Sequence, residues 1–188
     1  MNTTIYFVRH AHSHFDLKNE RLRELSEKGW NDVSAVTDIL TKEQVNRIYS
    51  STYTRAVQTV EEYAKSLNQV VEVDERLREG MLSHADFHFE NANASLKFAM
   101  ENPDFTYDGG ESRRSIQARG VEALKEIVAK HQGEKIAIGT HGYILMAMMN
   151  HIDSSYGFDF FLSTTNPDIY RVEVSPEFEL VDMERLWK

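Results

Sequence analysis

The chain has 188 residues, a formal net charge of −9 and no cysteine. The lack of cysteine excludes disulfide frameworks, thiol catalysis and cysteine-bound metals. The acidic balance argues against nucleic acid or an anionic membrane as the main partner, because both attract basic surfaces.

The first predicted element is a strand over residues 5–8, a continuous apolar run that is rich in β-formers. This run is too short for a signal-peptide core of about 7–15 residues or a membrane span of about 20 residues. We therefore expect a cytoplasmic protein without a membrane partner.

Strand and helix patterns alternate along the rest of the chain. Ser26 and Ser112 stand where N-caps of helices are expected. The predicted elements after the first strand are a helix over 26–40, a strand over 47–50, a helix over 52–67, a strand over 70–73, helices over 92–101 and 112–132, a strand over 135–139, a helix over 143–152, and a hairpin over 169–174 and 178–181. Such alternation predicts an α/β fold, a three-layer α/β/α sandwich around a mostly parallel central sheet.

Residues 79–110 interrupt this alternation. They hold several aromatic side chains without clean periodicity, apart from the short helix over 92–101. We call this segment the excursion, because it is predicted to leave the sheet, and we consider it a candidate lid. Residues 1–188 are predicted to form a single domain that includes it.

Polar residues with catalytic potential follow the predicted strands. Arg9 and His10 come directly after the first strand, Arg55 follows the second, Glu79 lies past the third and His141 follows the fourth. Ligands of parallel α/β sheets bind beyond the carboxyl ends of the strands, so these side chains should converge at one edge.

The converging set suits a phosphoryl dianion. Guanidinium groups can each hold two of its oxygens, a neutral imidazole can attack phosphorus, and a carboxylic acid can protonate the departing alkoxide. The two arginines supply the cationic clamp, so no metal ion and no cofactor is expected. A small-molecule phosphate ester is the expected partner.

Three ordered motifs resemble those of the histidine phosphatase superfamily, also called the phosphoglycerate mutase-like family. They are Arg9-His10-Ala11 after the first strand, Ser50-Ser51 followed by Arg55-Ala56-Val57-Gln58-Thr59, and Thr140-His141-Gly142. The resemblance implies the phosphoglycerate mutase-like fold and catalysis of phosphoryl chemistry.

The resemblance also implies a role for each converging residue. His10 would be the nucleophile that becomes a phosphohistidine, while Arg9, Arg55 and His141 would bind the phosphoryl oxygens. Glu79 would act as the general acid and then as the base that activates water. The neighbouring carboxylate of Glu75 is the alternative for this last role.

The chain departs from the family pattern at three positions. Ala11 replaces the usual glycine, Ser13 stands at a threonine and can keep a hydroxyl for phosphate binding, and Asp16 stands at an asparagine. A carboxylate at position 16 would repel phosphate, and the chain is shorter than the cofactor-dependent mutases. Both features favour a phosphatase, with mutase-type phosphoryl transfer as the alternative.

Two further alternatives belong to other classes of function. His10, His12 and His14 alternate, and an extended segment would place them on one face as ligands of a metal-dependent hydrolase. The chain could also be a non-catalytic member of the fold that binds an anion or a partner. His12, Asp16 and His84 are the candidates for lining a substrate pocket.

Overall fold

A computed structural model describes residues 1–16 and 18–188, and the strands within them form one six-stranded sheet in the order β3-β2-β4-β1-β5-β6. Four neighbouring strands are parallel, namely β1 (Thr3–Arg9), β2 (Arg47–Ser50), β3 (Glu72–Val73) and β4 (Lys135–Thr140). Two antiparallel pairings add β5 (Asp168–Val174) beside β1 and β6 (Leu180–Arg185) at the edge. The prediction of a mostly parallel sheet is confirmed.

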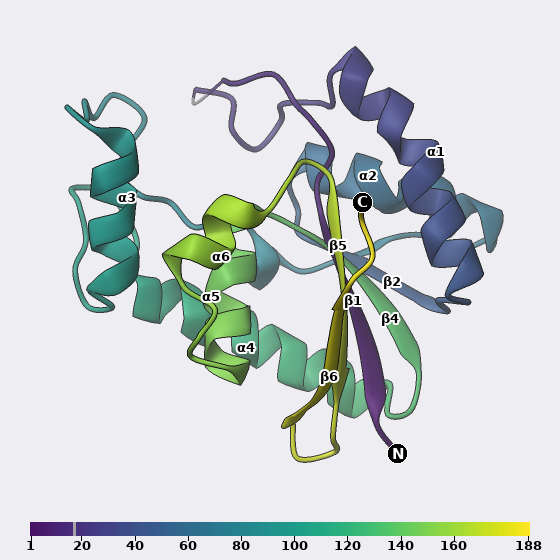
Figure 1. Cartoon of the computed structure of the whole chain (residues 1–188). Helices are drawn as coiled ribbons and strands as arrows, with labels where there is room; N and C mark the ends of the chain where they lie inside the picture. Colours follow the sequence, from purple (N-terminus) through teal and green to yellow (C-terminus); the bar gives the residue numbers. More distant parts are fainter. Residues whose placement is uncertain (17) are drawn as a thin grey trace.

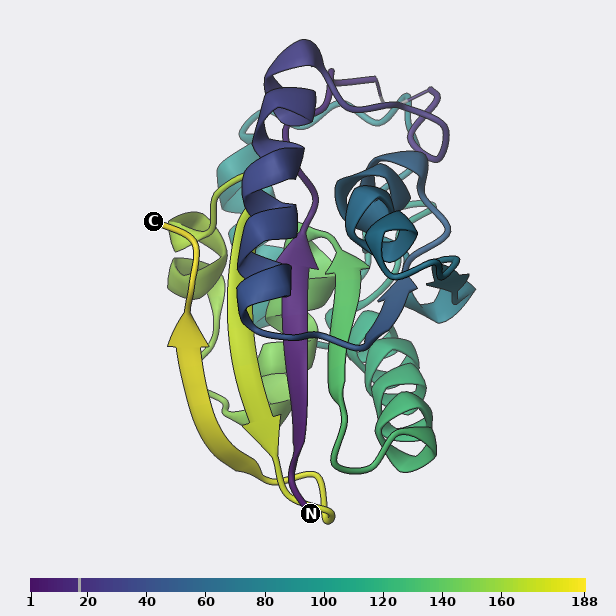
Figure 2. The same ribbon diagram turned by 90° about the vertical axis from the view of Figure 1, so that its right-hand side faces the viewer.

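Helices cover both faces of the sheet, as Figure 2 shows. On one face lie α1 (Glu27–Lys42) and α2 (Thr54–Ser66), and on the other lie α4 (Arg113–Lys130) and α5 (Gly142–Ile152). The remaining helical segments are the 3-10 turn η1 (Glu75–Leu77), α3 (Ala92–Glu101) and α6 (Phe158–Ser163). In the described part of the chain, no helix has both the length and the hydropathy to cross a bilayer.

The alternation of side chains along β1 explains the three layers. Tyr6 and Val8 pack in the cluster that includes residues of α1 and α2. Ile5 and Phe7 pack in the larger cluster that includes residues of α4 and α5. A strand that is buried on both faces has a continuous run of apolar residues. The apolar run over residues 5–8 therefore indicated a strand in the interior of the sheet. The predicted α/β/α sandwich is confirmed.

The predicted helix caps are present. The side chain of Ser26 accepts a hydrogen bond from the Gly29 amide, and that of Ser112 accepts one from the Ser115 amide. Each cap satisfies an amide group that has no partner inside its helix. The caps help to define where α1 and α4 begin, and therefore how the loops before them approach the sheet.

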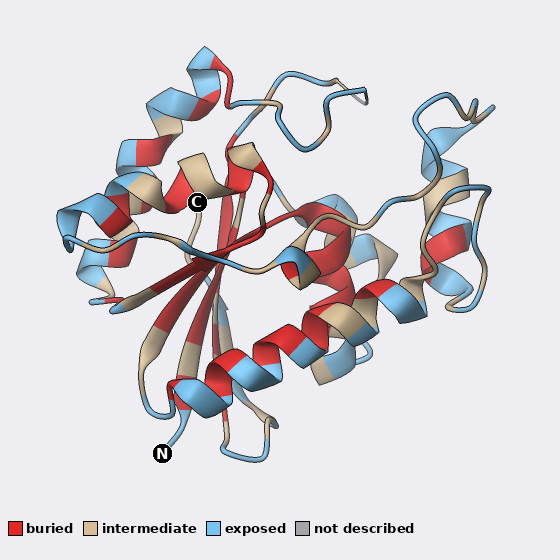
Figure 3. Ribbon diagram, turned by 180° about the vertical axis from the view of Figure 1, so that it is seen from behind, coloured by how far each residue is buried: buried red, intermediate tan, exposed pale blue. Residues whose placement is uncertain are grey.

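The excursion projects from the side of the sandwich, with α3 farthest from the sheet (Figure 1). Most of its residues are exposed or half-buried (Figure 3). Its aromatic rings form a small cluster of their own, with centroids 4.7 to 5.7 Å apart for the pairs of Phe87, Phe89 and Tyr107. The excursion thus has a small aromatic cluster of its own, and it is also anchored to the central core through the buried Met100 and through Leu82 and Leu96.

The structure differs from the predicted elements at several places, among them the unpredicted 3-10 turn η1. The third strand is limited to Glu72–Val73, since Val70 is exposed and does not pack on the sheet. The last strand begins at Leu180, because Phe178 adopts a positive φ of 65° in the preceding turn. The short helix α6 was not predicted, because its six residues are too few to show helical periodicity.

Candidate active site

The site begins where β1 and β4 end side by side. Arg9 and Thr140 are partners in the parallel register, and the His10 amide donates to the Thr140 carbonyl at 2.9 Å. His10 and His141 therefore leave the sheet together, and their ring centroids are 5.3 Å apart. The predicted convergence of these two histidines at the carboxyl ends of the strands is thus present in the structure.

His10 is held as a neutral imidazole with its ring lone pair on Nε2. Its Nδ1 lies 2.7 Å from the Ala11 carbonyl, which can only accept, so Nδ1 carries the proton. Its Nε2 accepts a hydrogen bond of 3.0 Å from Nε of Arg55. Burial, together with the nearby Arg55 cation, lowers the pKa of His10 well below its usual value.

Arg55 lies in the first turn of α2 and is buried, with 1% of its side chain exposed. Its Nη1 donates to the Glu20 carbonyl and its Nη2 to Oε1 of Glu20, both at 2.6 Å. Burial lowers the pKa of Arg55, and the Glu20 carboxylate opposes that effect. Glu20 thus occupies a donor edge of Arg55 that could also bind a phosphoryl oxygen.

His141 is fully buried between the ends of the strands. Its Nε2 lies 2.7 Å from the Ser51 hydroxyl, and its ring packs 5.1 Å from that of Tyr53. Within the described residues, its Nδ1 has no hydrogen-bond partner. Burial lowers the pKa of His141 well below its usual value, with added contributions from Arg55 and His10.

Arg9 reaches the opposite side of the site. Its Nη1 donates to the Thr164 carbonyl at 3.1 Å and also to the Thr164 hydroxyl, and its guanidinium lies 5.7 Å from the Phe161 ring centroid. Its Nε is buried and has no partner in the part of the chain that the structure describes. Burial lowers the pKa of Arg9, while Glu79 and Asp168 oppose that effect.

Glu79 sits at the N-terminus of α5. Its Oε1 accepts hydrogen bonds of 3.1 Å from the amides of both Tyr143 and Ile144. The positive end of the helix dipole favours a carboxylate at this position. The acid suggested as an alternative, Glu75, accepts instead from Thr52 at 2.5 Å and from Arg21. Glu79 is therefore the carboxylate that shares the α5 N-terminus with Arg9.

Gly142 explains how closely Arg9 approaches this helix. A Cβ atom at position 142 would lie 3.0 Å from Nη2 of Arg9 and 2.9 Å from the Phe161 ring. A side chain there would displace the guanidinium. The glycine of the Thr140-His141-Gly142 motif is thus needed for space.

The other predicted site residues lie apart from this centre. Ser13 forms an isolated bridge with Leu25, and His12 Nδ1 lies 2.7 Å from the Ser26 hydroxyl. Asp16 accepts from the Lys18 amide at 3.0 Å in a local turn. Among the described residues, none of the recorded hydrogen bonds of His10, Arg55 or His141 involves Ser13, His12 or Asp16.

His84 lines a cavity of about 690 Å³ that also borders Glu79, Glu20 and Tyr53. This places His84 beside the candidate site. His12 and Asp16 are not among the described residues that line this cavity.

The alternating histidines are arranged differently from a metal site. His10 is buried against Arg55, whereas His12 and His14 are exposed, with ring centroids 6.5 Å apart. Across residues 1–16 and 18–188, no group of three or more histidine, aspartate or glutamate side chains is placed to hold a metal ion.

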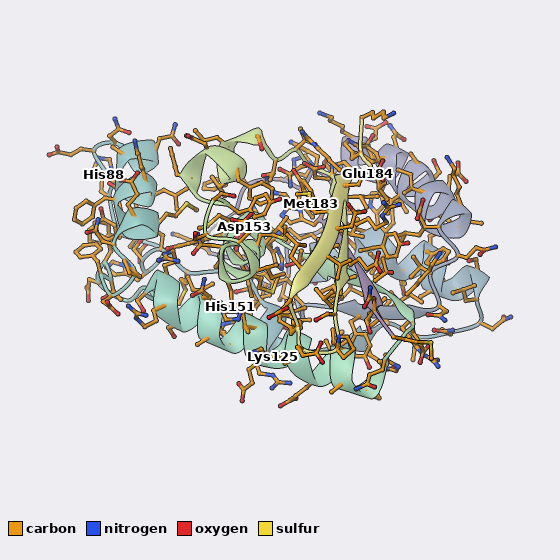
Figure 4. The ribbon with its side chains drawn as sticks, turned by 60° about the horizontal axis from the view of Figure 1, so that its bottom comes forward. His88, Lys125, His151, Asp153, Met183 and Glu184 are labelled. Atoms are coloured by element: carbon orange, nitrogen blue, oxygen red, sulfur yellow. The ribbon has the colours of Figure 1, made fainter. Side chains whose placement is uncertain are left out.

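Two other histidines, His88 and His151, are labelled in Figure 4. His88 belongs to the exposed part of the excursion. His151 lies near Lys125, and burial together with this cation lowers its pKa. Neither histidine belongs to the converging set.

Several residues of the centre were not singled out by sequence reasoning. Glu20 and Thr164 contact Arg55 and Arg9 across 35 and 155 positions of the chain. They lie in irregular segments, where no periodicity or motif marks them. Ser51 belongs to the motif that begins at Ser50-Ser51. Its place in that motif was a signal that could have identified it as a residue of the site.

Comparison with known proteins identifies the family. The profile of the histidine phosphatase superfamily, branch 1, matches residues 5–181. A metal-independent phosphoserine phosphatase of Arabidopsis thaliana is 29% identical over 160 residues, which cover 78% of this chain and 67% of that protein. A glucosyl-3-phosphoglycerate phosphatase of Mycobacterium tuberculosis is 35% identical over 112 residues, which cover 56% of this chain and only 50% of the relative.

Solved structures share the fold. The native structure of a mycobacterial glucosyl-3-phosphoglycerate phosphatase superposes with a TM-score of 0.76 at 21% identity, and the match covers 99% of this chain and 98% of that one.

Proposed function

Because this chain belongs to the histidine phosphatase superfamily, we propose that it hydrolyses phosphate monoesters through a phosphohistidine on His10. The observation that carries this proposal is the arrangement around His10 Nε2. This atom bears a lone pair, is buried, and lies among Arg55, Arg9 and His141. The substrate is a small-molecule phosphate ester.

The phosphoryl group binds where buried donors converge. Nε of Arg9 and Nδ1 of His141 are both buried and unpaired within the described residues. Such groups are costly to bury without a partner, and a phosphoryl dianion would satisfy both. Arg55 adds a third donor once the substrate competes with Glu20. These donors stabilise the charge that spreads over the phosphoryl oxygens in the transition state.

The first chemical step transfers the phosphoryl group to His10. The Nε2 lone pair attacks phosphorus while the bond from phosphorus to the ester oxygen breaks. Glu79, protonated for this step, donates its proton to the departing oxygen and the alcohol leaves. The product is a phosphohistidine and an ionised Glu79.

The second step regenerates the site. The Glu79 carboxylate accepts a proton from water, and the oxygen of that water attacks phosphorus as the bond from phosphorus to Nε2 breaks. Inorganic phosphate leaves, and both His10 and Glu79 return to their starting states. The hydrogen bonds from the amides of Tyr143 and Ile144 hold the Glu79 carboxyl group in place for both steps.

The test is turnover of p-nitrophenyl phosphate by the wild type and by His10→Ala. We expect His10→Ala to lose activity by at least about 10³-fold, as expected when a covalent nucleophile is removed. The matched control is His151→Ala, which removes an exposed histidine at the end of α5 and should retain activity. Acid-labile labelling of the wild type by a radioactive ester should report the phosphohistidine.

Four outcomes would contradict the proposal. Activity retained in His10→Ala would exclude His10 as the nucleophile. Loss of activity on chelation with EDTA would favour the metal-dependent hydrolase. A wild type that turns over no phosphate ester would favour the binding protein, and transfer of phosphate to a second alcohol instead of water would favour the mutase.

A further inference from the structure

A cavity of about 690 Å³ opens beside the proposed catalytic centre. Glu79, Glu20 and Tyr53 border it on the side of that centre. The remaining wall comes from two segments that are far apart in the sequence, the loop after β1 and the excursion. Its apolar wall residues are Phe15, Leu22, Met81, Leu82, Phe87 and Phe89. We call this space the apolar cavity.

Three of these apolar side chains are unusually exposed. Phe15 is 79% exposed, Leu22 is 73% exposed and Met81 is 49% exposed. Isolated exposed apolar residues are common, but a group of them around one concave space marks a binding surface. Water in contact with these side chains would be released when an apolar ligand covers them.

Aromatic rings from the excursion complete the wall. Phe87 and Phe89 lie with ring centroids 4.7 Å apart and both border the apolar cavity. Rings fixed in a cluster offer a preorganised surface for stacking or edge contacts with a ligand ring. The excursion therefore contributes contact surface as well as its own small core.

Most of the charged groups in the wall are already paired with the protein. Glu20 binds Arg55, and Glu79 accepts from the α5 amides. Arg21 pairs with Glu75 and lies 5.4 Å from the Tyr53 ring centroid. These pairings leave the apolar side chains as the main surface for a ligand, with Lys18 as one further charged residue in the wall.

We infer that the apolar cavity binds the alcohol half of the substrate, and that this half is a bulky apolar group containing a ring. The inference rests on the proposed function, because it takes the phosphoryl group to lie at His10. A small, fully polar alcohol would leave Phe15, Leu22 and Met81 in water. An aryl or arylalkyl group would cover them while its oxygen points toward Glu79.

The test uses primary alkyl phosphates, because their leaving alcohols are similar in basicity. These esters differ mainly in the group that would occupy the apolar cavity. We expect kcat/KM for 2-phenylethyl phosphate to exceed that for glycerol 1-phosphate by about tenfold or more. Phosphoglycolate tests whether Lys18 instead selects a carboxylate. A double variant, Phe15→Ser with Met81→Ser, should bring the ratio for the first two esters close to one.

The matched control is Phe98→Ser. Phe98 is an exposed aromatic residue of the excursion, 48% exposed, and is not among the residues that border the cavity. This variant should keep both the activity and the preference of the wild type. A preference that survives the double variant, or is lost equally in Phe98→Ser, would overturn the inference.

The outcomes separate this inference from the proposed function. Hydrolysis without preference for the phenylethyl ester, or with preference for phosphoglycolate, overturns the inference while the phosphatase proposal stands. If no ester is hydrolysed, calorimetric binding of the same three esters to the wild type decides the inference alone. Equal dissociation constants, or tighter binding of glycerol 1-phosphate or phosphoglycolate, would then overturn it.

Discussion

At the scale of single residues, the decisive property is that His10 is neutral. Burial and Arg55 hold its pKa well below the usual value, and the Ala11 carbonyl directs the remaining lone pair to Nε2. The same burial lowers the pKa of His141. If His10 is the nucleophile that we propose, it needs no general base to deprotonate it at neutral pH.

The pKa shift predicts the acid limb of the pH profile. A lowered pKa keeps His10 neutral at more acidic pH, so kcat/KM should stay level down to about pH 6.5 and decline only below it. The measurement is kcat/KM against pH, divided by the fraction of substrate dianion, since phosphate monoesters have a second pKa of about 6. Half-loss at or above about pH 6.5, the ordinary histidine value, would show that His10 is not shielded.

The same shift has a consequence for stability. As pH falls below about 6.5, the unfolded chain takes up protons at His10 and His141 before the native state does. The contribution of these two groups to the free energy of unfolding therefore decreases toward acid. Bound phosphate would offset this effect, because an anion favours protonated imidazole.

At the scale of elements, the N-terminus of α5 organises the centre. His141 precedes the helix, Glu79 accepts from its first amides, and Gly142 leaves room for Arg9. Parallel strands and the helices that follow them direct amide groups to one edge of the sheet. The motif Thr140-His141-Gly142 thus combines the buried His141 with the space that the Arg9 guanidinium occupies.

Gly142→Ala tests this packing. The new methyl group would meet the guanidinium of Arg9 and the ring of Phe161, so KM for a phosphate ester should rise by about tenfold, or about 1.4 kcal/mol. The control is Gly157→Ala, where the new methyl group would have no neighbouring atom within 4 Å. Thermal unfolding should show that both variants fold, and equal KM values for the two variants would contradict the role of Gly142.

At the scale of the whole molecule, an acidic protein contains a small cationic site. The net charge is −9, yet Arg9 and Arg55 are largely buried beside two histidines. An acidic surface disfavours the approach of long polyanions, and the proposed function places a single phosphate group beside these two cations. Arg55 is already paired with Glu20, whereas the buried Nε of Arg9 has no partner within the described residues, so an anion bound there would add to the stability of the native state.

Inorganic phosphate should therefore stabilise the fold. At about a hundred times its dissociation constant, a ligand adds about 2.7 kcal/mol to the free energy of unfolding. For a chain of this size, that corresponds to a rise in Tm of roughly 5 to 11 °C by calorimetry. Chloride at equal ionic strength and Arg55→Met with the same phosphate concentration are the controls. An equal rise in Arg55→Met would place the anion elsewhere.

Sequence reasoning was most successful where a pattern has a local physical cause. The apolar run over residues 5–8 predicted a central strand, and Ser26 and Ser112 predicted helix starts, because burial and capping act within a few residues. It was less successful at Phe178 and at α6, where a positive φ and a six-residue helix have no periodic signature.

The main alternation of strands and helices, the resemblance to the family, and the positions of Arg9, His10, Arg55 and His141 after strands of the sheet all follow from the amino-acid sequence alone. The hydrogen-bond partners that hold the two arginine side chains are known only from the folded chain. Glu20 on Arg55, Thr164 on Arg9 and the apolar cavity join segments far apart in the chain. Such contacts depend on how loops fold over the sheet, because no local periodicity constrains them. The net charge of −9 is a sum over the whole sequence, whereas the burial of Arg9 and Arg55 beside His10 and His141 is known only from the folded chain.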